Sequence, residues 1–455
     1  MDAQPKNKVV VIGAGVAGLS AAYYLRKRGV DVEIFERTAH AGGAVRTVLK
    51  EERYLLEQGP NAFLASAEPI AMLARELSIN PQIVGSDALS RRRYIRARGS
   101  MHELPMGPGS FLKSRLLSFR GKLRMFAELM VKTKSAGSES LAQFVARRAG
   151  REVLDSLVDP FVSGVWAGDA AQLEVESVCP KLVDIERECG SVLRGMKKLA
   201  GGSQKRGLFS FRWGMGTLTA RLEEEMKNRL HLETSVRSVE RGRGGGFKIR
   251  LDGKTLPVEA DAVVVAAPAP VAAIMLAELD PDIATPLGAV PYAPLAVVHT
   301  AFAEKDIPVP LDGFGVLISR SEKIRLLGSI WSSAIFPSRC PKGEALLTNF
   351  IGGATDPGLV DLSDDEITAE VLSGLESTMG IRAKPRRVFV KRTGQSIPQY
   401  TVGHGRRLKM IEERLLGLPG IFLTGSYFNG VSVSDTIAHA RAEVDRVSAY
   451  LKAKR

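Results

Sequence analysis

The stretch ALSRRRYIRARGSMHELP, residues 88–105, contains Arg91, Arg92, Arg93, Arg96 and Arg98. A guanidinium presents its N–H donors as a planar fork, which suits bidentate binding of carboxylates and phosphates. Nucleic acid, anionic lipid and a carboxylate-bearing small molecule are therefore all candidate ligands of this segment. Which of these ligands the arginines bind depends on the surrounding elements.

The other residues that could do chemistry do not cluster. The cysteines Cys179, Cys189 and Cys340 are odd in number and have no metal-ligand spacing. The six histidines are scattered singly. We therefore expect free thiols in a reducing compartment and no metal site.

A nucleotide site is predicted near residue 9. The β-branched run 9–12 is typical of a buried parallel strand, and Gly13, Gly15 and Gly18 follow it as a GxGxxG. A helical pattern then runs over 16–28. In such a unit the first glycine permits a tight turn, the second lets the backbone approach a pyrophosphate, and the third lets the helix pack closely.

A second strand-like segment, DVEIF at 31–35, ends at Glu36, which lies 21 residues after Gly15. A carboxylate at this place accepts hydrogen bonds from ribose hydroxyls and disfavours a 2′-phosphate. The helix N-terminus would bind the phosphates through its free N–H groups. The sequence therefore predicts FAD or NAD rather than NADP.

Length and composition narrow the class further. With 455 residues, 45% of them hydrophobic and 25% charged, the chain should fold into two or three globular domains. The net charge of +13 favours polyanionic partners, but no nucleic-acid-binding module is present. No apolar run reaches the length of a membrane span, and the glycines indicate that the apolar start is a nucleotide site rather than a signal peptide.

The nucleotide fold is expected to be interrupted. Residues 91–202 lack strand alternation and carry helical patterns, including an amphipathic basic one at 110–134. From about Phe209 a helix, a strand, a hairpin and a strand return the chain to the nucleotide domain. Residues 270–385 read as strands with one helix, which is typical of a sheet domain.

Three segments give the chain a family resemblance. A GGxxRT follows the acid, QGPNAF follows that, and IFLTGSYFNGVSVSDTI at 421–437 reads as strand, glycine, turn and helix. Together with the glycine fingerprint they resemble the FAD-dependent amine oxidase superfamily. Motifs spread along the chain, among them FVSGVWAGDAAQLEVESVCPKL, YAPLAVVH and SIPQYTVGH, resemble the protoporphyrinogen and coproporphyrinogen oxidases within it.

The resemblance implies an α/β fold with an α+β part: a Rossmann-like FAD-binding domain, a mixed-sheet substrate domain and an inserted helical, membrane-associated domain. We expect the FAD-binding domain in three parts, at 1–88, 206–268 and 387–455. The helical domain should span 89–205, and the substrate sheet domain 269–386.

The resemblance also implies non-covalent FAD, because no cysteine follows Cys340 to form a covalent flavin link. By motif position the cofactor-binding residues are Gly13, Ala14, Gly15, Val16, Ala17, Gly18, Glu36, Arg37, Gly42, Gly43, Arg46, Gly59, Pro60, Asn61, Ala62, Val236, Gly425, Val431, Ser432 and Val433. Two positions depart from the family pattern. Ser432 stands where a small Gly or Ala is common, and Thr393 where bacterial relatives often carry an aromatic residue.

The substrate-binding residues implied by the family are Arg93, Gly164, Trp166, Leu317, Ile330 and Phe350. A porphyrinogen is an apolar macrocycle with carboxylates on one edge, so it needs apolar walls and a guanidinium for a bidentate grip. Arg93 would bind a propionate. Without the motifs, the apolar residues would be ordinary core positions and Arg93 a solvated side chain.

We therefore expect an oxygen-dependent enzyme of haem biosynthesis that converts protoporphyrinogen IX to protoporphyrin IX in three flavin cycles and releases hydrogen peroxide. No general base stands out. Oxidation of coproporphyrinogen III is the main alternative, and a flavin amine oxidase or a non-catalytic flavin-bound scaffold are remoter ones.

The remaining arginines and the 110–134 segment favour a peripheral position on an anionic membrane, at the inner face of the cell membrane, in an otherwise cytoplasmic protein. The alternative is a helix packed internally with a solvated basic side. The family also implies a hand-off of product to a ferrochelatase, and homodimerisation is a further expectation.

Overall fold

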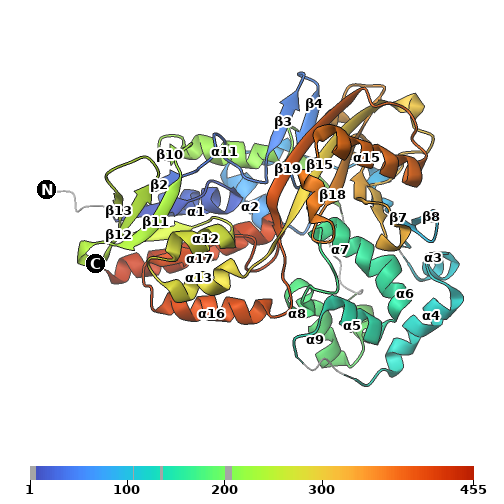
Figure 1. The fold of residues 1–455 in the computed structure, drawn as a ribbon, viewed down its shortest axis with the longest axis horizontal. Coiled ribbons are helices and arrows are strands. Elements are labelled where there is room, and N and C mark those ends of the chain that lie inside the picture. Colours follow the sequence, from blue (N-terminus) through green and yellow to red (C-terminus); the bar gives the residue numbers. More distant parts are fainter. Residues whose placement is uncertain (1–6, 106, 134–136, 200–206, 455) are drawn as a thin grey trace.

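The computed structural model describes residues 7–105, 107–133, 137–199 and 207–454. A parallel sheet with helices on both faces forms one end of the molecule, and a larger sheet with a group of helices beneath it forms the other (Figure 1). No described helix combines the length and the apolar composition needed to cross a bilayer.

The parallel sheet is assembled from segments that lie far apart in the sequence. Its order is β10-β2-β1-β14-β20, and each neighbouring pair is parallel. Its strands are β1 (Lys8–Ile12), β2 (Asp31–Phe35), β10 (Leu230–His231), β14 (Ala262–Val265) and β20 (Ile421–Leu423). The sequence predicted strands at 9–12 and 31–35 in a parallel sheet, and the structure confirms both.

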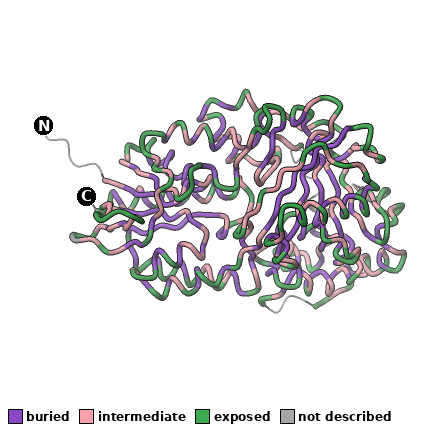
Figure 2. The backbone as a smooth tube through the Cα atoms, turned by 45° about the horizontal axis from the view of Figure 1, so that its top comes forward, coloured by how far each residue is buried: buried purple, intermediate pink, exposed green. Residues whose placement is uncertain are grey.

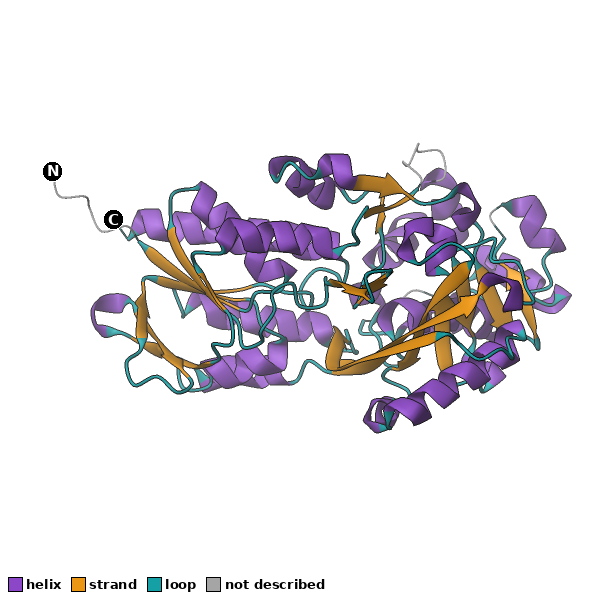
Figure 3. Ribbon diagram, turned by 90° about the horizontal axis from the view of Figure 1, so that it is seen from above, coloured by secondary structure: helices purple, strands orange, loops and turns teal. Residues whose placement is uncertain are grey.

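Helices cover both faces of this sheet (Figure 3). On one face Val9 and Val11 share a core with α1 (Val16–Lys27), α2 (Glu68–Glu76), α11 (Gly216–Met226) and α17 (Val433–Ala453). On the other face Val10 and Ile12 pack with α12 (Ala269–Leu276), α13 (Pro281–Gly288), α16 (His404–Leu416) and a small sheet of β11 (Val236–Arg241), β12 (Phe247–Leu251) and β13 (Val258–Ala260). Residues 269–288 therefore belong to this end of the molecule and not to the substrate sheet, where we expected them.

The larger sheet has seven strands in the order β19-β15-β18-β17-β16-β7-β8. They are β7 (Tyr94–Ala97), β8 (Ser100–Glu103), β15 (Tyr292–Ala303), β16 (Gly315–Ile318), β17 (Leu326–Ile330), β18 (Glu344–Gly352) and β19 (Arg387–Pro398). Its central strands are buried (Figure 2), and α15 (Asp364–Met379) packs on one face. Two expectations are corrected here: residues 94–103 are strands rather than part of the helical segment, and 387–398 continue this sheet rather than the FAD-binding domain.

A group of short helices lies on the opposite side of the larger sheet (Figure 1). They are α3 (Pro108–Lys113), α4 (Phe119–Phe126), α5 (Leu141–Arg148), α6 (Arg151–Val153), α7 (Asp159–Trp166), α8 (Val175–Val178), α9 (Pro180–Cys189) and α10 (Val192–Leu199). The single helix expected at 110–134 is wrong, because the chain leaves α3 at Ser114 and starts α4 only after Ser118. The carboxylate of Glu152 accepts hydrogen bonds from both the N–H (2.5 Å) and the hydroxyl (2.6 Å) of Ser118.

Two small sheets join the ends of the molecule. A hairpin of β3 (Thr47–Lys50) and β4 (Tyr54–Glu57) precedes the expected flavin segment. A second small sheet pairs β5 (Phe63–Leu64) and β6 (Ile83–Gly85) with β9 (Leu208–Phe211). The helical turn α14 (Ser332–Ile335) lies between β17 and β18.

Candidate functional site

The three glycines after β1 have different surroundings. Gly13 has φ +100°, and a Cβ there would lie 3.1 Å from the carbonyl oxygen of Ala266. A Cβ on Gly18 would collide with the carbonyl oxygen of Gly13. At Gly15, in contrast, a Cβ would meet no atom of the described residues within 4 Å, apart from its neighbours in the chain. Gly13 and Gly18 are thus required by the turn and the helix packing, whereas Gly15 borders open space.

This space lies at the N-terminus of α1, which no side chain of the described residues caps. The N–H groups of Val16, Ala17 and Gly18 therefore remain available to an anion. Beside them, the carboxylate of Glu36 accepts the N–H of Ala14 (2.9 Å) through Oε2 and the N–H of Thr38 (2.9 Å) through Oε1. Oε1 also accepts the hydroxyl of Thr38 (2.8 Å), so the lone pair left for a ribose hydroxyl is on Oε2.

The other expected cofactor segments lie next to this loop. The Gly42 N–H donates to the carbonyl oxygen of Ala14 (2.8 Å), and a Cβ on Gly59 would collide with the carbonyl oxygen of Ala44. The GGxxRT and QGPNAF motifs are thus packed together beside the glycine turn. Arg46, Pro60, Asn61 and Ala62 are half-buried, and Gly43 and Arg37 are exposed.

Val236, expected to contact the adenine, is buried at the start of β11. The segment before it runs along Glu36, since the Thr234 N–H donates to the carbonyl oxygen of Glu36 (2.8 Å). Val236 therefore lies near the ribose end of the expected site.

At the other end, residues 425–433 follow β20, just as the glycine turn follows β1, so both leave the carboxyl edge of the same parallel sheet. Ser432 is the N-cap of α17: its hydroxyl accepts the N–H of Asp435 (3.1 Å) and donates to the Asp435 carboxylate (2.6 Å). The serine that departs from the family pattern thus has a local structural role. Val431 and Val433 beside it are half-buried, and Gly425 is buried at the end of the strand.

The apolar residues expected at the substrate meet on one face of the larger sheet. Leu317 is paired with Gly328, and Gly328 with Phe350, while Ile330 lies two residues beyond Gly328. Side chains two residues apart in a strand share a face, so Leu317, Ile330 and Phe350 line the same surface, hereafter the substrate face. All three are half-buried.

Helix α7 packs against the substrate face. A Cβ on Gly164 would collide with the side chain of Leu317, so the glycine allows this close approach. Phe161, one helical turn earlier, and Val165 are 48% and 42% exposed on the same side of the helix. Sequence reasoning missed both residues, although their spacing around Gly164 in FVSGVW was a usable signal.

Trp166, the expected aromatic neighbour of Gly164 at the substrate, packs away from the substrate face. It is buried, and its ring packs edge-on against Tyr400 with 4.8 Å between centroids. Its carbonyl oxygen accepts a hydrogen bond from Nε2 of Gln399 (2.8 Å). Thr393 is half-buried on β19, opposite Leu295.

The arginine-rich segment divides into paired and unpaired side chains. Arg92 forms ion pairs with Glu103 and Asp312, Arg96 with Glu322, and Arg98 with Glu152. These three side chains form ion pairs within the protein, and the membrane role expected for them stays a prediction.

Arg93 differs from these three. Within the described chain no carboxylate pairs with it, and its guanidinium lies 5.6 Å from the ring of Phe314. It is exposed and has the strand parity of Ile95, which is paired with Leu317 of the substrate face.

Known proteins resemble this chain over nearly its whole length. Residues 16–448 match the sequence profile described as flavin containing amine oxidoreductase. The chain belongs to the flavin-containing amine oxidoreductase family. It is 32% identical to coproporphyrinogen III oxidase of Bacillus subtilis (strain 168), over 98% of this chain and 99% of the relative, and 32% identical to mitochondrial protoporphyrinogen oxidase of Nicotiana tabacum, over 98% and 95%.

Solved structures of the family have the same fold. A crystal structure from Exiguobacterium sp., provisionally named a protoporphyrinogen oxidase, matches with a TM-score of 0.85 at 25% identity over 99% of this chain and all of that one. Cyclohexylamine oxidase from Brevibacterium oxydans shares the fold alone, with a TM-score of 0.72 at 15% identity over 98% of this chain and 100% of that one.

As a member of this family the protein is an FAD-dependent oxidoreductase. The residues at the carboxyl edge of the parallel sheet fit the cofactor: uncapped N–H groups and the open side of Gly15 suit a pyrophosphate, and Glu36 suits a ribose.

In this flavoenzyme two aromatic residues hold the loop before α17. His404 stacks on Tyr400 with 4.1 Å between centroids, and its Nε2 donates to the carbonyl oxygen of Tyr427 (2.9 Å). The Tyr400 hydroxyl accepts the N–H of Gly430 (3.0 Å) and donates to the carbonyl of Ser426. Burial lowers the pKa of His404 to about 4, so its ring is neutral at physiological pH.

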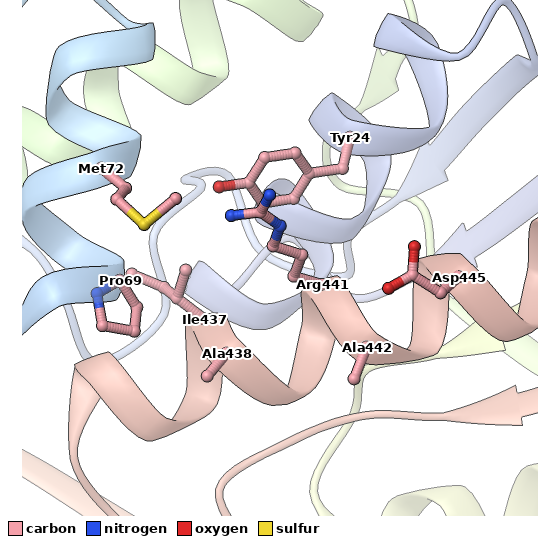
Figure 4. Close-up of a pocket in the computed structure, with 8 residues that line it drawn as sticks. All are labelled: Tyr24, Pro69, Met72, Ile437, Ala438, Arg441, Ala442 and Asp445. Atoms are coloured by element: carbon pink, nitrogen blue, oxygen red, sulfur yellow. The ribbon is translucent and has the colours of Figure 1, made fainter.

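A cavity of about 300 Å³ opens between α1, α2 and α17 (Figure 4). Tyr24, Met72 and Arg441 line it, and the Arg441 guanidinium lies 5.5 Å from the Tyr24 ring. None of the cofactor or substrate residues expected from the sequence lines this cavity.

Proposed function

We propose that this flavoenzyme oxidises protoporphyrinogen IX to protoporphyrin IX. The observation that carries the proposal is the unpaired guanidinium of Arg93 at the border of an apolar face. An apolar macrocycle with propionates on one edge matches that arrangement, whereas a small primary amine has no carboxylate for Arg93 to bind. The names of the relatives at 32% identity support the same substrate class.

In this proposal the chain binds and orients the ring. Leu317, Ile330 and Phe350 form one apolar wall, and Phe161 and Val165 extend it on α7. Arg93 binds a propionate, and an Arg–carboxylate hydrogen bond stabilises the complex by about 1.5–3 kcal/mol. Exclusion of water by the apolar walls strengthens that interaction.

When bound, FAD supplies the hydride acceptor and, with dioxygen as the final oxidant, the capacity for three successive two-electron oxidations. We infer that it is held non-covalently, because no cysteine follows Cys340 in the sequence. The N–H groups at the start of α1 and the carboxylate of Glu36 would hold its pyrophosphate and ribose.

Coproporphyrinogen III is the second candidate substrate, and one observation favours it. Arg91 is also exposed and has no ion-pair partner in the residues that the structure describes, so two unpaired guanidinium groups lie close together in the sequence. Four propionates would use more such groups than two. The Bacillus subtilis relative carries that substrate in its name.

The test is a fluorimetric assay of the FAD-loaded protein in air, with freshly reduced protoporphyrinogen and coproporphyrinogen and with buffer blanks. Faster formation of protoporphyrin supports the main proposal, and faster formation of coproporphyrin selects the alternative. Rates equal to the blank for both substrates would overturn the proposal and favour an amine oxidase or a flavin-bound scaffold.

We also propose a peripheral position on an anionic membrane. In the α3–α4 region Leu112, Phe119, Leu123 and Met130 are each at least 61% exposed, with Phe119 at 81%. Exposed basic residues lie among them: Lys113, Arg115, Arg120 and Lys132. Apolar side chains that enter the interface, together with basic ones that attract anionic lipid, are typical of reversible membrane binding.

A further inference from the structure

A buried ion pair joins the two halves of the molecule beside the expected flavin segment. Glu57 ends β4, two residues before Gly59, and is 3% exposed. Arg339 approaches it from the turn between α14 and β18 and is 2% exposed. Its Nη2 lies 3.0 Å from Oε1 of Glu57.

The Glu57 carboxylate has further partners from the FAD-binding half. Oε1 accepts the N–H of Met215 (2.9 Å), and Oε2 accepts the hydroxyl of Thr47 (2.6 Å). Arg339 also donates to Ser210 (2.9 Å), but its buried Nη1 has no acceptor in the described part of the chain. Burial raises the pKa of Glu57 to about 7 despite the neighbouring guanidinium. Such a pair contributes little net stability, which favours another role for it.

The backbone of the same residue is held as well. The carbonyl oxygen of Glu57 lies 3.0 Å from Nε2 of His299, and Nδ1 of His299 lies 3.0 Å from the hydroxyl of Thr348. His299 is 1% exposed, and burial lowers its pKa to about 4, so the ring is neutral. A neutral ring that faces a carbonyl must carry its hydrogen on Nε2, which leaves Nδ1 to accept from Thr348.

These contacts lead directly to the substrate face. Thr348 is paired with His299 on one side and with Ile330 on the other, and it lies two residues before Phe350. Residue 57 is therefore the link between the flavin segment at 59–62 and the strands that carry the wall. Arg339 binds the side chain of Glu57 and His299 binds its backbone, and both come from the half of the molecule that contains the larger sheet.

We propose that Glu57, Arg339 and His299 are positioning residues that fix the distance between the substrate face and the flavin. The inference rests on the proposed function, because that distance matters for transfer from a ring bound on the face. Reacting atoms must approach within about 3–3.5 Å, and a displacement of about 1 Å costs on the order of 10²-fold in rate.

The test compares Glu57→Gln and Arg339→Met with Arg148→Met in the FAD-loaded protein. Glu57→Gln keeps the side-chain shape but leaves the guanidinium unpaired. Arg148 is a matched control, since it is also 2% exposed and pairs with Glu186 (2.5 Å), but its partners all lie in the helical group. Visible circular dichroism and the midpoint potential of the bound flavin are measured first, followed by its anaerobic reduction by protoporphyrinogen.

We expect both interface variants to retain FAD with an altered flavin dichroism and to be reduced at least about 10-fold more slowly at saturating substrate. The half-saturating concentration should change little. Arg148→Met should match the wild type in all three readouts even if its melting temperature falls equally. The double variant Glu57→Gln with Arg339→Met should be no worse than Glu57→Gln alone, because no buried charge then remains unpaired.

Wild-type flavin dichroism, potential and reduction rate in both interface variants would overturn the inference, as would the same changes in Arg148→Met. If Glu57→Gln does not fold, Arg339→Lys, which keeps the charge but not the fork, provides the same readouts. If the wild type itself is not reduced by a porphyrinogen, the proposed function fails, while dichroism and potential still test the positioning role.

Discussion

At the scale of single residues, Arg93 is set apart from its neighbours by what it lacks. Arg92, Arg96 and Arg98 pair with carboxylates of the sheet or of the helical group. Arg93 contacts the Phe314 ring and no carboxylate of the described chain. Its replacement should therefore affect ligand binding without affecting folding.

We predict that Arg93→Ala raises the KM for the porphyrinogen by about 10-fold to 100-fold, the equivalent of the 1.5–3 kcal/mol expected for a hydrogen bond to a charged group. Melting temperature and flavin spectrum should stay at wild-type values. Arg382→Ala, at an 83% exposed arginine paired with Glu376, is the control and should leave KM unchanged. An unchanged KM in Arg93→Ala would remove this arginine from the substrate site.

The glycine turn yields a prediction at the same scale. Gly15→Val adds a side chain where, apart from the adjoining residues, no atom of the described chain lies within 4 Å of the Cβ, so the chain should fold but the pyrophosphate should be excluded. We expect at least 100-fold weaker FAD binding by titration, with the thermal stability of the apoprotein unchanged. Gly18→Val should instead prevent folding, because its Cβ collides with Gly13. Normal FAD binding by Gly15→Val would contradict the assignment of the loop.

At the scale of elements, α4 and the turn that follows it expose apolar side chains on the surface. Phe119, Leu123 and Met130 are exposed, while Arg124, which looks like a surface cation in the sequence, donates to the carbonyl oxygens of Arg147 (2.8 Å) and Arg148 (2.9 Å) at the end of α5. The apolar surface is therefore available, and one of the basic residues is used internally.

We predict that the triple variant Phe119→Ser, Leu123→Ser, Met130→Ser loses most of its cosedimentation with anionic phospholipid vesicles and keeps its turnover in detergent. The basic neighbours make wild-type binding sensitive to salt. The control is Leu256→Ser, because Leu256 is also 81% exposed but lies far from α4 in the sequence. Equal sedimentation of wild type and triple variant would refute the membrane proposal.

Three buried histidines make the stability of the fold sensitive to acid. Burial lowers the pKa of His299, His404 and His439 to about 4 each. Between pH 6.5 and 4 the unfolded chain binds these protons and the folded chain does not, so the free energy of unfolding falls as pH falls. Glu57, with its raised pKa, has the opposite sign over about pH 4.5 to 7.

We predict that His404→Gln reduces the slope of unfolding free energy against pH by about 1.4 kcal/mol per pH unit between pH 6 and 5. Urea unfolding at a series of pH values measures it. The His40→Gln variant, at an exposed histidine, is measured alongside as the control. An identical slope in wild type and His404→Gln would mean that His404 is not held neutral by burial.

At the scale of the whole molecule, local patterns predicted local structure well. The turn at Gly13, the helix that follows it and the start of α17 near Val433 are set by neighbouring residues, and the structure confirms them. The strands at 94–103 could not be predicted, because β7 is completed by β16, more than 200 residues later. The helix expected at 110–134 is divided before Ser118, which is the N-cap of α4 and binds the distant carboxylate of Glu152.

In the site, too, local motifs were predicted from the sequence but long-range contacts were not. Motifs identified Gly164 and Leu317 separately, and only the fold shows that they touch. The direction of Trp166 depends on Tyr400, and the freedom of Arg93 depends on which carboxylates its neighbours bind. These contacts join residues that are far apart in the sequence, and the pattern of a single sequence does not predict such contacts.

The most direct test of the central claim is anaerobic mixing of the FAD-loaded protein with protoporphyrinogen IX or coproporphyrinogen III, with the visible absorbance of the oxidised flavin followed in time. We predict rapid bleaching by a porphyrinogen, recovery of the absorbance when air is admitted, and one porphyrin formed for every three flavin cycles. A flavin that neither porphyrinogen bleaches, but that dithionite reduces normally, would contradict the account.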